Sequence, residues 1–234
     1  MSETSRVFIG SDIHNIKAER ALIYSIMKNT RSPVEINIMS RFGDDISWKG
    51  WQNTSKWATC FSCFRWAIPA VCGFQGRAIY LDSDMIVLGD IDDLNNSDAS
   101  KGIATTPARE SSVMVFDCSC FVNLPQFQIE ALKQDAAQTG SYYRWLRDQG
   151  MVTFITQDWN CLDGKDFDEI RTKLIHYTEL PWQPWHPAPQ RFSYVPHPHK
   201  KVTEIWHQYY EESFDTAQSP HFKMASHISP FSNL

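Results

Sequence analysis

The chain has 234 residues, enough for one domain of generous size or one domain with an appended segment. Its formal charge of −5 offers no electrostatic attraction to nucleic acid, and no run approaches the roughly 18 apolar residues that span a bilayer. Six cysteines, with no apolar signal core at the N-terminus, indicate reduced thiols, so we expect a cytoplasmic protein.

The first 120 residues alternate between strand-like and helix-like patterns. This order predicts an α/β fold with a mostly parallel central sheet flanked by helices, in which ligands bind beyond the carboxyl ends of the strands. In chain order we expect a strand at 7–10, a helix at 16–28, a strand at 34–39, a loop at 41–55, a helix from Thr54 or Ser55 to Ala67, and a strand at 78–81.

Two carboxylates, Asp82 and Asp84, lie where the strand at 78–81 ends and before a second apolar run at 85–88. Because side chains alternate along a strand, both carboxylates project to the same side. Two hard oxygen donors at the end of a strand suit a divalent cation that holds a phosphorylated ligand. A surface turn with two solvated acids is the alternative, and the flanking apolar strands disfavour it. Asp12, after the first strand, falls at the same edge of the sheet.

The second half of the chain has a different character. Residues 174–200 are dense in proline, tryptophan and histidine, and rigid aromatic loops beside a strand-end site suit a sugar pocket. A packed C-terminal cap is the alternative. The expected regular elements are strands at 113–116 and 120–122, helices at 125–137 and 142–146, and an amphipathic helix at 200–213.

Two cysteine pairs have short spacings, Cys60 with Cys63 and Cys118 with Cys120. Together they could form a zinc site. However, Cys60 shares a helical stripe with aromatic residues, and no glycine-rich knuckle surrounds either pair, so buried thiols are the preferred interpretation.

Several segments together resemble glycosyltransferase family 8, which includes glycogenin and bacterial lipopolysaccharide galactosyl- and glucosyltransferases. The similarity covers roughly residues 6 to 187, and its most specific part runs from Thr59 to Leu94. The segments are Phe8-Ile9-Gly10-Ser11-Asp12, Thr59-x-Phe61-x-x-Phe64-Arg65-Trp66-x-Ile68-Pro69, Gly76-Arg77-x-Ile79-Tyr80-Leu81-Asp82-Ser83-Asp84-Met85-Ile86-Val87-x-Gly89-Asp90-Ile91-x-x-Leu94, and Ile175-His176-Tyr177-Thr178 with Gln183-Pro184-Trp185.

The resemblance implies a single GT-A domain over 1–234, a Rossmann-like nucleotide-binding fold. Residues 6–122 would be the nucleotide-sugar-binding half and residues 123–234 the acceptor half. It also implies a hexosyltransferase that uses a nucleotide-sugar, which we expect to be a UDP-sugar, and that retains the anomeric configuration. The acceptor would be a carbohydrate, a glycolipid or a protein. Peripheral contact of the enzyme with a membrane is compatible with this function.

The resemblance also assigns roles to individual residues. Asp82, Asp84 and His176 would bind Mn²⁺, or Mg²⁺, and this mixture of ligands suits Mn²⁺ better than Zn²⁺. The other implied roles are contacts to the nucleotide-sugar by Ser11, Asp12, Arg65, Ser83 and Gln183, and catalytic positions near the donor sugar for Arg65, Gln157 and Asp158.

The chain departs from the family pattern at three positions. Gln183 stands where the family has a phosphate-binding lysine, and Thr156 stands where an acid is usual before Gln157. The asparagine that follows Asp158 comes one residue early, as Asn160.

Two other functions remain open. One is a non-catalytic protein that binds a nucleotide-sugar or carbohydrate, which the missing lysine favours. The other is a phosphohydrolase of the haloacid-dehalogenase type, in which a strand-end Asp-x-Asp supplies a nucleophile and a general acid. Ile86 stands where that class has Thr or Val, and a later Gly-Asp-Gly motif is missing, so the sequence disfavours it.

Overall fold

The computed structural model describes residues 4–40, 51, 54–108, 111–187 and 193–215. Within those ranges, every helix is too short or too polar to cross a bilayer. Most of the loop expected at 41–55 lies outside the described residues.

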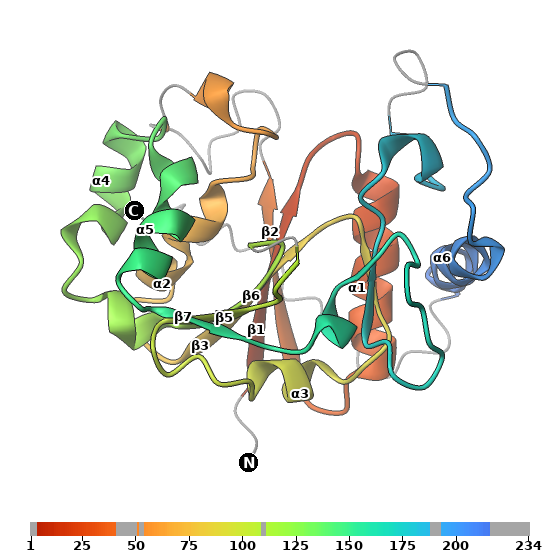
Figure 1. Ribbon diagram of the computed structural model, residues 1–234, viewed down its shortest axis with the longest axis horizontal. Helices are drawn as coiled ribbons and strands as arrows, with labels where there is room; N and C mark the ends of the chain where they lie inside the picture. Colours follow the sequence, from red (N-terminus) through yellow and green to blue (C-terminus); the bar gives the residue numbers. More distant parts are fainter. Residues whose placement is uncertain (1–3, 41–50, 52–53, 109–110, 188–192, 216–234) are drawn as a thin grey trace.

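A six-stranded sheet forms the centre of the fold, in the order β2-β1-β3-β6-β5-β7 (Figure 1). All of its neighbouring strands pair in parallel except at β6, which runs antiparallel to both β3 and β5, so the expected mostly parallel α/β sheet is confirmed. The strands are β1 (Ser5–Ser11), β2 (Val34–Ser40), β3 (Arg77–Asp82), β5 (Ile103–Thr105), β6 (Val113–Asp117) and β7 (Val152–Phe154).

Helices cover both faces of this sheet, and the alternation of side chains along the strands separates two cores. Phe8 and Tyr80 point into one cluster, while Ile9 and Ile79 point into the other. The first cluster packs against α2 (Ile68–Val71), α4 (Ile129–Gln134) and α5 (Tyr142–Asp148). The second packs against α1 (Ile16–Asn29) and α3 (Ile91–Asn95) (Figure 1).

A second, smaller sheet joins distant parts of the chain, in the order β4-β9-β8. Its strands are β4 (Met85–Val87), β8 (Cys161–Leu162) and β9 (Leu174–His176). β4 pairs antiparallel with β9, and the register sets Met85 opposite His176. Next to this sheet, a third core joins α1 to the amphipathic helix α6 (Lys200–Glu212), which confirms the helix expected at 200–213.

Three sequence predictions of local structure were wrong or only partly right. The helix expected up to Ala67 is instead two 3₁₀ helices, Thr54–Lys56 and Phe64–Ala67, with turns between them. Turns satisfy the same apolar spacing, because the rings of Trp57 and Phe64 still meet at a centroid distance of 5.1 Å. Pro69 stands in the first turn of α2, where a missing N–H has no intrahelical partner to lose.

The expected strand at 120–122 is a 3₁₀ helix, Cys118–Phe121. Its cause is local, since the side chain of Asp117 accepts a hydrogen bond from Ser119 N at 3.1 Å and so caps the helix. The helix expected at 125–137 is divided into the 3₁₀ helix Pro125–Phe127 and α4. The expected helix at 142–146 is confirmed as α5.

Candidate metal centre

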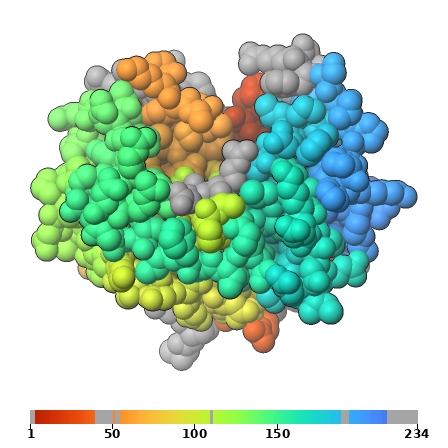
Figure 2. All heavy atoms as spheres, viewed as in Figure 1, coloured from red at the N-terminus to blue at the C-terminus, as the bar shows by residue number. Residues whose placement is uncertain are grey.

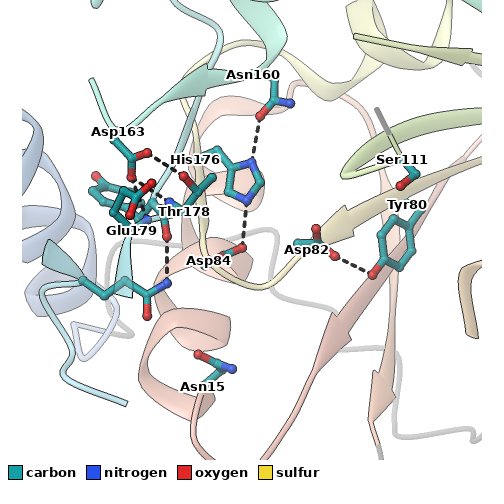
Figure 3. Close-up of polar contacts among 12 residues, drawn as sticks. Asn15, Tyr80, Asp82, Asp84, Ser111, Asn160, Asp163, His176, Thr178 and Glu179 are labelled. Carbon is teal, nitrogen blue, oxygen red and sulfur yellow. Dashed lines mark hydrogen bonds and ion pairs between the residues drawn. The ribbon is translucent and has the colours of Figure 1, made fainter. Parts of the chain in front are cut away.

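Asp82, Asp84 and His176 come together at the carboxyl end of β3 (Figure 3). Each offers one ligand atom, and these atoms all lie within 4.8 Å of one another. Asp82 ends β3, and Asp84 lies in the turn that leads into β4. His176 ends β9, and the hydrogen bond from Tyr177 N to Asp84 O at 2.9 Å ties that strand to the turn.

The carboxylate of Asp82 is held from one side. Its Oδ1 accepts hydrogen bonds from Tyr80 Oη at 2.6 Å and from Arg65 Nη2 at 3.0 Å. Burial raises the pKa of Tyr80 well above its usual value, so its hydroxyl stays protonated and donates. Both bonds use the same oxygen, which leaves the second carboxylate oxygen available to a further ligand.

Asp84 and His176 face each other through Asp84 Oδ1 and His176 Nε2. Asp84 Oδ1 is buried and has no hydrogen-bond partner among the described residues, although it lies 3.2 Å from His176 Nε2, at ion-pair distance. Burial lowers the pKa of His176, but the carboxylates of Asp84, Asp82 and Asp163 together raise it by more, so the net pKa lies above its usual value. A positive charge between the two side chains would therefore stabilise the pair, and either a proton on the imidazole or a metal ion can supply it.

The residue types fit a divalent ion. Two carboxylates and one imidazole form a mixed oxygen and nitrogen set, which Mn²⁺ accepts readily. The carboxylate side chains are 18% and 23% exposed, so solvent and a ligand can reach them. Figure 2 shows the surface hollowed between the segments coloured orange and green and those coloured cyan and blue.

Arg65 is buried rather than extended toward a ligand. Its guanidinium donates to Asp82, to Ser62 O and to Ser111 O, and it lies over the ring of Tyr80 at 4.2 Å from the centroid. Burial lowers the pKa of Arg65, but Asp82 and neighbouring groups together raise it by more, so the side chain stays charged. In this arrangement Arg65 orients the carboxylate of Asp82.

The residues expected to contact the nucleotide-sugar have different surroundings. Ser11 and Ser83 are buried, and Ser83 N donates to Gly10 O at 3.0 Å. Asp12 is partly exposed, and its Oδ1 accepts from His14 N and from Asn15 Nδ2, both at 2.9 Å, which closes the loop before α1.

Gln183 is also buried, and its amide lies inside the protein. Its Nε2 donates to Tyr177 O at 2.7 Å, whereas its Oε1 is buried and has no hydrogen-bond partner among the described residues. One of the two N–H groups of Nε2 is therefore already used by the backbone that follows β9.

The structure does not bring Gln157 and Asp158 into the Asp82–Asp84–His176 cluster. The amide of Gln157 bridges two backbone groups, accepting from Ala108 N at 3.0 Å and donating to Asn160 O at 2.7 Å. Asp158 pairs with the exposed Arg171 at 3.2 Å. Their proximity to a donor sugar stays a prediction.

Two buried polar residues near the cluster were given no such role by sequence reasoning. Asp163 accepts from Thr178 N, Thr178 Oγ1 and Glu179 N at 2.5 to 3.0 Å, and so fixes the chain just after His176 (Figure 3). Asn160 Oδ1 contacts His176 Nδ1 at 2.9 Å. The sequence marked Asn160 only as the displaced asparagine of the family pattern and did not mark Asp163, because both act through contacts between separate strands and loops.

No protein-family model matches the chain. A curated relative, Protein CDI of Arabidopsis thaliana, is 27% identical, and the match covers 76% of this chain and 79% of that protein.

Solved glycosyltransferase structures resemble the fold. The galactosyltransferase LgtC, solved with donor and acceptor sugar analogs, gives a TM-score of 0.58 at 9% identity, covering 87% of this chain and 95% of LgtC. GlyE of Streptococcus pneumoniae TIGR4 gives 0.61 at 17% identity, covering 92% of this chain and 64% of GlyE. The bifunctional glycosyltransferase WbbM gives a TM-score of 0.60 at 15% identity. The match covers 94% of this chain but only 50% of WbbM. At these identities the likeness concerns architecture, and the fold of this chain is that of the GT-A glycosyltransferases.

Proposed function

We propose that this protein is a metal-dependent glycosyltransferase. It would transfer a hexose from a nucleotide-sugar, a UDP-sugar by preference, to a carbohydrate, glycolipid or protein acceptor, with retention of configuration. The observation that carries the proposal is the convergence of Asp82, Asp84 and His176 at the carboxyl end of a central strand in a GT-A fold.

The three side chains would hold Mn²⁺, or Mg²⁺, between them. A bound ion would neutralise the diphosphate leaving group as the bond from sugar to phosphate breaks. The protein's own contribution is preorganisation: Tyr80 and Arg65 fix one oxygen of Asp82, while the β4–β9 register fixes His176 against Asp84. Fixed ligands need no reorganisation when the donor binds.

The remaining site residues are proposed for the donor. Ser11, Asp12 and Ser83 would lie beside the nucleotide, with Asp12 contacting the base or ribose. Gln157 and Asp158 would lie near the donor sugar. Residues 6–122 would supply most of the donor site and residues 123–234 the acceptor site, although His176 belongs to the second half.

One observation favours a second candidate, a protein that binds nucleotide-sugars without turnover. Gln183 replaces the family's phosphate-binding lysine, and its Nε2 is already engaged with Tyr177 O. The second N–H of that amide could still donate to a phosphate, but the neutral amide lacks the positive charge that the lysine would bring.

A donor screen separates the two candidates. Purified protein is incubated with a panel of nucleotide-sugars and Mn²⁺, and donor cleavage is followed by NMR or mass spectrometry, since glycosyltransferases commonly leak donor to water. The enzyme should release UDP from at least one UDP-sugar, and EDTA should stop the release. A thermal shift with UDP and Mn²⁺ but no cleavage of any donor would favour the binding protein. Neither shift nor cleavage would refute both.

A further inference from the structure

The side chain of Asn160 is completely buried, and both its amide nitrogen and its amide oxygen have hydrogen-bond partners. Its Nδ2 donates to Thr106 Oγ1 at 2.9 Å and to Ala108 O at 3.1 Å, and its Oδ1 lies 2.9 Å from His176 Nδ1. Thr106 Oγ1 in turn donates to Ala108 O at 3.0 Å, so the hydroxyl has a lone pair left to accept from the amide.

This network fixes which way the amide points. A backbone carbonyl can only accept, so the atom that faces Ala108 O has to be the nitrogen of Asn160. Rotating the amide by half a turn would place Asn160 Oδ1 against Ala108 O, two acceptors without a hydrogen between them. It would also break the bonds that Nδ2 donates to Thr106 and Ala108. The oxygen of Asn160 therefore faces His176.

An amide oxygen also can only accept, so His176 Nδ1 has to carry the hydrogen of this contact. In the neutral ring the other nitrogen, Nε2, then carries a lone pair. That lone pair faces the cluster, because Nε2 is the atom that lies 3.2 Å from Asp84 Oδ1. A hydrogen on Nε2 would block metal binding at this position. Without a metal, Asp84 Oδ1 competes by accepting such a hydrogen, and the Asn160 contact is the interaction that selects against that tautomer.

We infer that Asn160 is a positioning residue that locks His176 in the tautomer with hydrogen on Nδ1, so that Nε2 is held ready as a metal ligand beside Asp84. The inference rests on the proposed metal-dependent function. It adds that the loop after β5 supports the metal centre through Thr106 and Ala108.

The tautomer can be measured without any metal. Nitrogen NMR of imidazole-labelled protein, at a pH high enough for the ring to be neutral, distinguishes a protonated Nδ1 from a protonated Nε2. His176→Gln identifies the signals of His176. We expect hydrogen on Nδ1 in the wild type and a mixture of tautomers in Asn160→Ala. A wild-type His176 with hydrogen on Nε2 would overturn the inference even if Asn160→Ala did not fold.

Metal affinity supplies the second measurement. Titration of the protein with Mn²⁺ alone, followed by electron paramagnetic resonance of the free ion, should give a Kd about 10- to 100-fold higher for Asn160→Ala, the usual effect of losing the partner of a ligating histidine. Asn160→Asp keeps an oxygen that accepts from Nδ1 and should recover part of the affinity.

Asn29 provides a matched control. Its Nδ2 donates to Ser25 O, Val87 O and Tyr209 Oη, so Asn29→Ala also removes a well-bonded amide but leaves His176 untouched. It should lower the melting temperature without changing the Kd for Mn²⁺.

The outcomes separate the two proposals. If the wild type and Asn160→Ala bind Mn²⁺ with the same Kd, the inference about Asn160 is overturned but the metal-dependent function is not. Asn160 would then be a structural residue. A wild type that binds no Mn²⁺ would overturn the metal-dependent function, and the purpose assigned to Asn160 with it.

Discussion

Replacing Gly10 with alanine should damage both the fold and the candidate metal centre. Gly10 lies in β1 opposite Asp82 of β3, and the space above its Cα is already taken. A Cβ there would lie 2.2 Å from Tyr80 Oη and 2.7 Å from Phe61 Cδ2. Tyr80 is fully buried and its hydroxyl donates to Asp82 Oδ1 at 2.6 Å, so the ring has little room to retreat without breaking that bond.

The magnitude follows from these two contacts. Forcing an extra carbon into a close-packed interior typically costs about 1–3 kcal/mol. A lost hydrogen bond to a charged group costs about 1.5–3 kcal/mol more. We therefore expect Gly10→Ala to lower the free energy of unfolding by about 2.5–6 kcal/mol, a large part of the roughly 5–15 kcal/mol that holds a domain folded.

Urea denaturation measures this loss, and Gly140→Ala is the control. Among the described residues, a Cβ at Gly140 would meet only Cys63 Sγ, at 3.8 Å, so that change should be nearly neutral. Because the closest clash is with the hydroxyl oxygen, Tyr80→Phe should relieve part of it. The loss of unfolding free energy in the Gly10→Ala, Tyr80→Phe double variant should therefore be smaller, by at least about 1 kcal/mol, than the sum of the losses in the two single variants. Additive losses, or a Gly10→Ala as mild as Gly140→Ala, would refute the reasoning.

Four further predictions concern the cluster and its surroundings. Asp82→Asn and Asp84→Asn should each abolish Mn²⁺-dependent donor cleavage while the protein stays folded, although Asp82→Asn should lower the melting temperature because the buried Arg65 loses its charged partner; near wild-type cleavage by either variant would remove that residue from the metal site. The Mn²⁺ affinity of the wild type should fall as the pH drops through the pKa of His176, which burial lowers and the carboxylates of Asp84, Asp82 and Asp163 together raise above the usual 6.5. His176→Ala should bind Mn²⁺ about tenfold more weakly and show no such pH dependence, and parallel Mn²⁺ titrations of the two proteins at about pH 6 and pH 8 decide this. Without metal the sign reverses, because the folded state holds that proton more tightly than the unfolded state: the His176–Asp84 pair should stabilise the protein below about pH 6.5 and lose its effect as the pH rises through the raised pKa. Burial raises the pKa of Cys161 to about 11, so iodoacetamide at about pH 8 should label it in urea but hardly at all in the folded protein, as mass spectrometry would report.

The pattern of the sequence determined those features that depend on neighbouring residues. The Asp82–Asp84 pair could be located because the alternation of a strand and its end are both local properties. The helices α1 and α6 followed from the period of their apolar residues in the same way. The period failed over 54–67, since successive turns bring the same aromatic rings together as an α-helix would.

The family resemblance named His176, but neither period nor propensity did. Its strand, β9, has three residues, too few to show a period. Its place beside Asp84 comes from the pairing of Met85 with His176, a register between segments far apart in the chain.

Only the tertiary structure decided how the cluster is supported. The contact between Asn160 and His176 and the close approach of Gly10 to Tyr80 each join separate elements. It also showed that Arg65 is buried against Asp82 and that the amide of Gln183 is bonded to Tyr177 O. Such contacts follow from how strands pair and layers pack, and the residues that flank each position in the sequence carry no signal for them.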